Sequence, residues 1–106
     1  MEGISGAFRR RAVQALVCPE TASSRLIDYR ISCYQPMAHV GLHTHKVQEQ
    51  VYHVLDGEGM MEMDGRRQVV RKHDVIYIPP GVAHAICNTG LGDLTFIVAT
   101  TPASDE

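Results

Sequence analysis

Histidine, glutamate and glutamine side chains are concentrated in one stretch, from His43 to Gly59, which reads HTHKVQEQVYHVLDGEG. In a β-strand, side chains at positions i and i+2 leave the same face, roughly 7 Å apart. His43 and His45 have this spacing, and both imidazoles could reach one metal ion, whose bond to an imidazole nitrogen is about 2.1 Å long. A His-x-His pair alone is more often two surface histidines than a metal site, so the prediction needs a ligand from elsewhere in the chain.

A further histidine follows a rigid turn in the stretch from Pro79 to Asn88, which reads PPGVAHAICN. Proline fixes the backbone dihedral φ and glycine permits a tight bend, so this turn determines how the chain delivers His84. The residues after the turn continue as a predicted strand, in which Ile86 shares the face of His84. This stretch therefore offers a third imidazole to add to those of His43 and His45.

Together the two stretches resemble the cupin family, whose motifs are G-x5-H-x-H-x3,4-E-x6-G and G-x5-P-x-G-x2-H-x3-N. The matching positions are His43, His45 and Gly57 in the first motif and Pro79, Gly81, His84 and Asn88 in the second. Met37 and His73 stand where the family has the glycines that open the two motifs. The resemblance covers residues 26–98 and implies an all-β, single-domain, double-stranded β-helix (jelly-roll) barrel with a metal ion bound inside it.

Two neighbouring residues, Glu49 and Gln50, compete for the fourth ligand position that the resemblance implies. Counting from His45, both fit the permitted spacing, but counting back seven residues from Gly57 selects Gln50. Adjacent residues of a strand point to opposite faces, so only one of the two can face the metal. Gln50 would share its face with the aromatic Tyr52. We therefore expect the metal ligands to be His43, His45, Gln50 and His84, with Glu49 as the alternative to Gln50.

Length and composition limit what else the chain can be. It has 106 residues, enough for one hydrophobic core, and its formal net charge of −2 does not favour nucleic acid or an anionic membrane as a partner. No apolar run approaches the ~18 residues of a membrane-spanning helix, and the N-terminus has no signal-peptide core. The three cysteines, Cys18, Cys33 and Cys87, are odd in number, which favours reduced thiols and a cytoplasmic location. We expect Cys33 and Cys87 to be buried.

Short β-rich runs separated by glycine and proline turns predict the strands of the barrel. The expected strands are 12–17, 26–34, 39–45, 51–55, 60–63, 68–71, 75–78, 85–88 and 94–100, and no segment has a convincing helical period. In 26–34 apolar and polar residues alternate, so we expect one face, formed by Ile27, Tyr29, Ile31 and Cys33, to be the buried one. Turns are predicted at Asp56 to Gly59 and at Asp64-Gly65. The chain divides into an N-terminal arm and edge strand (1–25), the barrel (26–100) and a polar tail (101–106).

Three imidazoles and a neutral amide would leave the full positive charge of a metal ion uncompensated, with open positions for water or a substrate oxygen. We therefore expect one divalent transition metal (Mn, Fe, Ni, Zn or Cu) and oxygenase, isomerase or lyase chemistry on an oxygen-rich small molecule. The alternative is a non-catalytic, metal-containing cupin that binds or senses a small molecule. Candidate acid–base residues are Tyr52, Tyr29 and His39. Edge strands also predict a homodimer, with exchange of the N-terminal strands as one form it could take.

Overall fold

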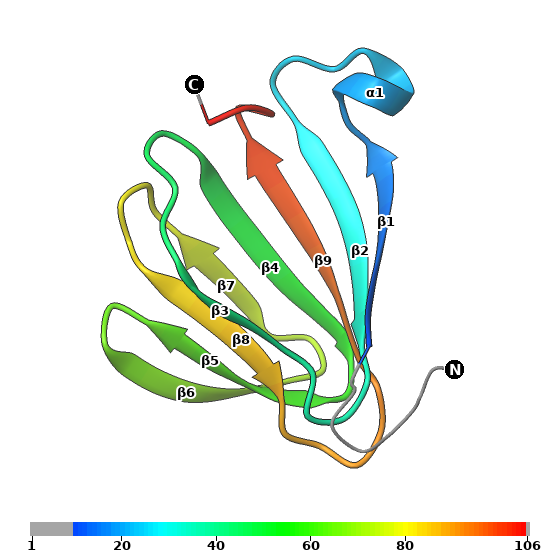
Figure 1. Cartoon of the computed structure of the whole chain (residues 1–106), viewed down its shortest axis with the longest axis vertical. Helices are drawn as coiled ribbons and strands as arrows, with labels where there is room; N and C mark the ends of the chain where they lie inside the picture. Colours follow the sequence, from blue (N-terminus) through cyan, green and yellow to red (C-terminus); the bar gives the residue numbers. More distant parts are fainter. Residues whose placement is uncertain (1–9, 106) are drawn as a thin grey trace.

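The computed structural model describes residues 10–105, which form nine strands and one short helix (Figure 1). The strands are β1 (Arg11–Val17), β2 (Asp28–Tyr34), β3 (His39–His43), β4 (Glu49–Asp56), β5 (Glu58–Met63), β6 (Arg66–Arg71), β7 (Val75–Ile78), β8 (His84–Asn88) and β9 (Leu94–Thr101), and the helix is α1 (Pro19–Ala22). A five-stranded antiparallel sheet has the order β1-β2-β9-β4-β7, and a four-stranded one the order β3-β8-β5-β6. The two sheets face each other, which confirms the predicted all-β jelly roll.

The hydrophobic core lies between the two sheets, because alternate residues of their strands point inward. On β4 the buried residues include Tyr52 and Val54. Phe96 of β9 packs between two tyrosines, with its ring centroid 5.4 Å from that of Tyr52 and 5.1 Å from that of Tyr34. The four-stranded sheet adds Met61, Val70 and Ile86 to the same cluster. These contacts hold the two sheets together around the interior that the histidines enter.

The prediction for the buried face of β2 is wrong. The buried residues are Asp28, Ser32 and Tyr34, whereas Tyr29, Ile31 and Cys33 lie on the outer face with part of their surface exposed. The register explains the reversal, because Ser32 lies opposite the buried Phe96 of β9. The carboxylate of Asp28 is compensated by Arg30, whose Nε and Nη2 donate to it at 2.7 and 2.9 Å. The alternation is present, but the outer face of β2 is only partly exposed and carries apolar residues, so its composition does not distinguish it from the inner face.

Positive φ angles shape several turns. Asp64 and Gly65 have φ of 53° and 78°, as in a type I′ turn, which confirms the predicted hairpin between β5 and β6. Met37 and His73 also have positive φ, 71° and 79°, a region that L side chains rarely adopt. These are the two positions where the cupin motifs have glycine. The backbone therefore keeps the conformation that glycine would favour, and this chain adopts it with larger residues.

The predicted turn from Asp56 to Gly59 is shorter than expected. β4 includes Asp56 and β5 begins at Glu58, so one residue, Gly57, separates the two strands. Gly57 has φ of 90°, and a Cβ there would collide with the carbonyl oxygen of Asp93. The glycine that the first motif places here is required by both its conformation and its surroundings.

β1 is the outer strand of the five-stranded sheet, and most of the N-terminal arm predicted before it lies outside the described residues. The single-turn helix α1, which was not predicted, is capped by Thr21, whose Oγ1 accepts a 3.0 Å hydrogen bond from the backbone of Cys18. Cys18 is buried, but Cys33 and Cys87 are partly exposed, so their predicted burial is wrong. All three thiols are free. Within residues 10–105 no helix is long and apolar enough to cross a membrane.

Candidate metal centre

Three histidines come together where β3 ends and β8 begins. His43 is the last residue of β3, His45 follows in the loop, and His84 is the first residue of β8. One ligand nitrogen from each lies within 4.8 Å of the other two. Ring centroids are 4.2 Å apart for His43 and His84, 5.2 Å for His43 and His45, and 5.5 Å for His45 and His84. Three nitrogens bound to one ion at about 2.1 Å lie roughly 3–4 Å apart, so small side-chain rotations would bring these three into range.

The pairing of β3 with β8 makes His43 and His84 direct neighbours in the ladder. Further along, Val40 pairs with Ile86, so three residues of β3 span two of β8, which is a β-bulge. The extra residue shifts the alternation, so that Val40 and His43 both face inward while His39 faces outward. His39 is a predicted acid–base residue because it shares parity with His43. Because of the bulge, His39 and His43 lie on opposite faces of the sheet, and His39 is not part of the histidine cluster.

Hydrogen bonds orient two of the three imidazoles. His43 Nδ1 lies 2.9 Å from the carbonyl oxygen of Gly41, and His84 Nδ1 lies 2.9 Å from that of Val82. A carbonyl oxygen can only accept, so each Nδ1 carries the proton and donates it, which leaves the lone pair on Nε2. A metal-binding histidine has this arrangement, with the nitrogen away from the metal donating to the protein.

Among the described residues, two buried side-chain atoms have no hydrogen-bond partner, His84 Nε2 and Gln50 Oε1. Gln50 is 9% exposed, and its Nε2 donates a 3.0 Å hydrogen bond to Thr100 Oγ1, which leaves the carbonyl oxygen as the unpaired end of the amide. An unpaired buried polar atom costs about 1–3 kcal/mol. An ion that accepts a lone pair from each atom would remove this cost. Three clustered imidazoles and an unpaired, buried amide oxygen are donors of the types that transition metals accept.

Glu49 and Gln50 lie on opposite faces of β4. Glu49 is exposed on the outer face, where its Oε1 accepts a 2.9 Å hydrogen bond from the hydroxyl of Tyr77 and raises the pKa of that tyrosine. Gln50 points into the barrel, opposite Ile78 of β7. Of the two, only Gln50 has the orientation that a ligand in the interior needs.

The surroundings of His45 and His84 favour the neutral form of both imidazoles. Burial lowers the pKa of His84, and the nearby His43 and His45 lower it further, against the hydrogen bond to Val82, which raises it. Burial also lowers the pKa of His45, and His43 adds to the effect. Metal ions bind the neutral form of histidine. These two histidines are therefore held in the form that a metal requires near neutral pH.

Comparison with known proteins decides the family. Residues 30–100 match the family of cupin domains. The chain belongs to the cupin family. Over 61 residues it is 39% identical to an uncharacterized protein of Methanocaldococcus jannaschii, a match that covers 58% of this cupin and 49% of that protein. Over 62 residues it is 37% identical to an oxalate-binding protein of Thermotoga maritima, covering 58% and 51%. The cupin thus spans about half the length of the curated relatives it matches.

Solved structures agree on the fold. The crystal structure of a predicted oxalate decarboxylase from Thermotoga maritima is similar to this cupin with a TM-score of 0.81. The two chains are 27% identical, and the match covers 87% of this cupin and 80% of the other chain.

Of the three acid–base candidates, Tyr52 alone shares the interior with the histidines. Its ring lies edge-on to His84 with a centroid distance of 6.1 Å, and burial raises the pKa of Tyr52 well above its usual value. Such a hydroxyl stays protonated near neutral pH, so it can donate a hydrogen bond but cannot act as a base. Tyr29 lies on the outer face of β2, and His39 on the outside of the four-stranded sheet.

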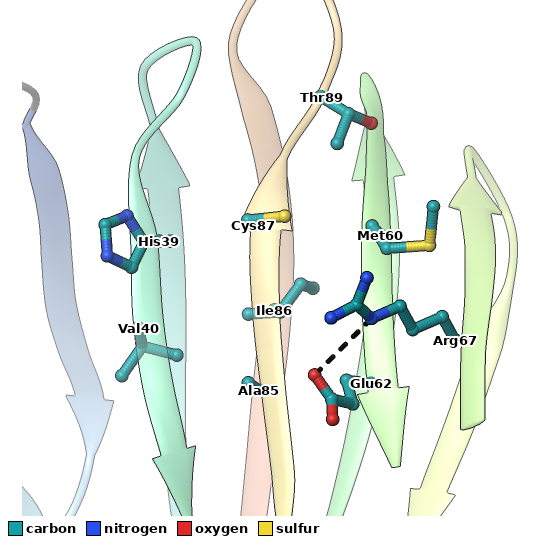
Figure 2. Close-up of a pocket in the computed structure, with 9 residues that line it drawn as sticks. All are labelled: His39, Val40, Met60, Glu62, Arg67, Ala85, Ile86, Cys87 and Thr89. Atoms are coloured by element: carbon teal, nitrogen blue, oxygen red, sulfur yellow. Dashed lines mark ion pairs between the residues drawn. The ribbon is translucent and has the colours of Figure 1, made fainter. Parts of the chain in front are cut away.

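His39 lines a groove on the outer side of the four-stranded sheet, next to Cys87 and Met60 on the neighbouring strands (Figure 2). The groove has a volume of about 540 Å³, and an ion pair between Arg67 Nε and Glu62 Oε1, 3.8 Å long, forms part of its wall. None of the three clustered histidines lines it. This hollow is therefore separate from the candidate metal centre, which faces the opposite side of the same sheet.

Two polar residues near the site were not identified from the sequence. Thr100 orients the amide of Gln50, and the alternation along β9 from the buried Phe96 would have placed it inward. Asp105 lies in the segment predicted to be a polar tail, yet its carboxylate binds the loop that follows His45. No sequence signal relates Asp105 to that loop, because the two are 57 to 59 residues apart.

Proposed function

We propose that this cupin holds one divalent transition metal ion through His43, His45, His84 and Gln50. The observation that carries the proposal is the pair of buried atoms without partners, His84 Nε2 and Gln50 Oε1, in the interior that also contains the three-histidine cluster. Bound there, the ion would act as a Lewis acid with positions open to the oxygen atoms of a ligand. Imidazole ligands suit several first-row ions, so Mn, Fe, Ni, Zn and Cu are all to be tested.

The proposed ligand is a small oxygen-rich anion, with the dicarboxylate oxalate as the first to test. Three neutral imidazoles and a neutral amide leave the charge of a divalent ion uncompensated, which favours an anionic ligand in the open positions. Similarity to an oxalate-binding protein and to the structure of a predicted oxalate decarboxylase, both from Thermotoga maritima, supports this ligand class.

Metal-dependent binding, without conversion of the ligand, is the function that the geometry supports best. Isomerase or lyase chemistry commonly uses a side chain that moves a proton at the substrate. Tyr52 is the candidate residue in the interior, and its raised pKa makes it a hydrogen-bond donor to a ligand oxygen rather than a base. Catalysis is the second candidate, supported by the similarity to the predicted oxalate decarboxylase.

Thermal unfolding of chelator-treated protein tests the proposal, with each metal alone, oxalate alone and both together. A metal present at 100 times its Kd adds about 2.7 kcal/mol to the free energy of unfolding. For a domain of this size that corresponds to a rise in Tm of roughly 10 °C or more. Oxalate should raise Tm further only when the metal is present, and His84→Ala should abolish both shifts while His53→Ala, on the outer face of β4, should keep them.

Two results would contradict the proposal: no stabilisation by any of the five metals, or an oxalate shift that does not need metal. Loss of oxalate from the mixture over several hours, measured against His84→Ala, would favour the catalytic candidate over simple binding.

We also propose that the cupin forms a homodimer through the outer face of its five-stranded sheet. An antiparallel sheet with one solvated face usually alternates apolar and polar residues, but most residues of this outer face are apolar, with His53 and Glu49 among the exceptions. It includes Ile31, Val51, Val75, Tyr77, Ile97 and Ala99, of which Val75 and Tyr77 are 60% and 51% exposed. Glu49 at its margin is bonded to Tyr77, so two copies could face each other without opposing free carboxylates there.

The size of this face is sufficient for a second copy of the chain. Five strands about 4.8 Å apart and six residues of about 3.4 Å each give a flat area on the order of 500 Å². Two copies would then bury about 1,000 Å², the lower bound for a specific interface.

The cytoplasmic location predicted from the odd number of cysteines is retained as part of the proposal.

A further inference from the structure

The carboxylate of Asp105 holds the loop that carries His45. Its Oδ2 accepts a hydrogen bond from the backbone N–H of Lys46 at 2.9 Å. Its Oδ1 accepts one from Val47 at 2.8 Å and one from Gln48 at 3.1 Å. Three donors converge on one side chain, so its position and its ionised form are both well determined.

The same loop is fixed from other directions. The side chain of Gln48 donates a 3.1 Å hydrogen bond to the carbonyl oxygen of Pro102, which precedes Asp105 in the same segment. On its other side, the carbonyl oxygen of His45 accepts a 2.8 Å hydrogen bond from the backbone N–H of Gly81. His45 therefore lies between two fixed points, although it lies beyond the end of β3.

One imidazole of the cluster lacks the backbone partner that the other two have. His43 and His84 each have Nδ1 at 2.9 Å from the carbonyl oxygen two residues earlier. For His45 the group facing Nδ1 is the Oδ2 atom of Asp105, at 3.9 Å. This separation is longer than a direct hydrogen bond, so the carboxylate acts on the ring through its charge or through one bridging water.

We infer that Asp105 is a positioning residue for His45: it fixes the loop and selects the ring tautomer that presents Nε2 to the cluster. The inference rests on the proposed function only in taking His45 as a metal ligand. A negative charge beside Nδ1 favours the proton on that atom, which leaves the lone pair on Nε2. Carboxylates oriented in this way are common partners of metal-binding histidines. Asp105 thus supplies to His45 what Gly41 and Val82 supply to the other two imidazoles.

Replacing Asp105 by asparagine separates the two roles. In Asp105→Asn the amide oxygen can take the place of Oδ1 and keep the bonds from Val47 and Gln48. The NH₂ group would then take the place of Oδ2, where it can only donate, so the hydrogen bond from the backbone N–H of Lys46 is lost while the other two remain. It would donate toward Nδ1 of His45 and favour the opposite tautomer, with the proton on Nε2. Asp105→Ala removes both roles, and Asp64→Asn at the exposed β5–β6 turn is the matched control.

Nitrogen-15 NMR of metal-free protein identifies which ring nitrogen of His45 carries the proton. Amide hydrogen exchange measures how well the loop at residues 46–48 is held. In wild type and Asp64→Asn we expect the proton on Nδ1 and protected amides at residues 46–48. In Asp105→Asn we expect the proton to move to Nε2 while the amides of Val47 and Gln48 stay protected. In Asp105→Ala we expect these amides to exchange at least tenfold faster.

Titration with Zn²⁺ adds the functional readout. Loss of a group that orients a metal ligand typically weakens metal binding by about 10–100-fold, and we expect this of both Asp105 variants. If Asp105→Asn binds Zn²⁺ as tightly as wild type and keeps the wild-type tautomer, the inference is overturned, whatever happens to the loop in Asp105→Ala. If wild type binds no Zn²⁺ or other metal, the proposed function fails, while the tautomer measurement still decides the role of Asp105.

Discussion

Replacing Gln50 by glutamate should destabilise the protein without metal and stabilise it with metal. Gln50 is 9% exposed and donates to Thr100, so a carboxylate there must either stay charged in the interior or take up a proton. Each unit of upward pKa shift costs about 1.36 kcal/mol at a pH where the unfolded carboxylate is ionised. We expect a loss of about 1–3 kcal/mol in metal-free protein, the usual cost of an unsatisfied buried polar group.

When the metal is bound, Gln50→Glu should instead increase the free energy of unfolding. A carboxylate beside a divalent ion offsets part of its charge, which the neutral amide of Gln50 cannot do. We expect the Kd for metal to fall at least about tenfold in Gln50→Glu, equivalent to about 1.4 kcal/mol. The same charge compensation should weaken the binding of an anionic ligand such as oxalate.

Competition of metal-free protein with a colorimetric chelator for Zn²⁺ measures the Kd. Thermal unfolding measures the expected loss of stability without Zn²⁺ and the expected gain with it. The matched control is Glu49→Gln, one residue away on the outer face, where the carboxylate accepts a hydrogen bond from Tyr77. Its charge is solvated and screened, so we expect a Kd within about threefold of wild type. A large loss of affinity in Glu49→Gln, with none of the expected changes in Gln50→Glu, would refute the assignment of Gln50.

Three further predictions concern the histidines and the assembly. His84→Ala should lose most of the bound metal after dialysis, while His53→Ala should retain it; equal metal content in the two would rule out the site as proposed. The folded metal-free protein binds protons on His45 and His84 more weakly than the unfolded chain does, so its free energy of unfolding should fall as pH decreases below about 6.5. A stability profile that stays flat from about pH 7.5 down to about pH 5 would contradict the lowered pKa values. Light scattering at micromolar concentration should give the mass of a dimer, and Val75→Lys should give a monomer; a monomeric wild type would overturn the proposed interface.

The histidines could be predicted because the spacing within each motif is local, and the jelly-roll fold was predicted through the family resemblance that these motifs carry. His43 is the last residue of β3, and His84 follows the Pro-Pro-Gly turn by three residues, so both side chains lie close to a turn that limits where they can point. The hairpin at Asp64-Gly65 was predictable for the same reason, since two consecutive positive φ angles restrict the residue types. The faces of Glu49 and Gln50 follow from simple alternation within β4, which has no irregularity at that point.

The errors occur where a property of the whole sheet overrides the local pattern. The buried face of β2 could not be identified because its outer face is also apolar, so alternation gives two faces without telling which is inside. His39 was misplaced because parity was counted through a bulge between Val40 and His43, where Gly41, an isolated glycine within a strand, was not taken as a signal of a bulge. Asp105 could not be found because its partners are distant in sequence and are backbone N–H groups, which every non-proline residue has.

The division of the proposed ligands between the two sheets would give a bound metal a structural role as well as a chemical one. His43 and His84 belong to adjacent strands of the four-stranded sheet, whereas Gln50 comes from β4 in the five-stranded sheet. An ion held by all of them would therefore bridge the sheets across the interior. The remaining ligand, His45, lies in the loop between a strand of one sheet and a strand of the other, and Asp105 holds that loop to the segment after β9. Since Gln50 is the single proposed ligand from the five-stranded sheet, its replacement tests the bridge between the sheets together with the charge at the metal.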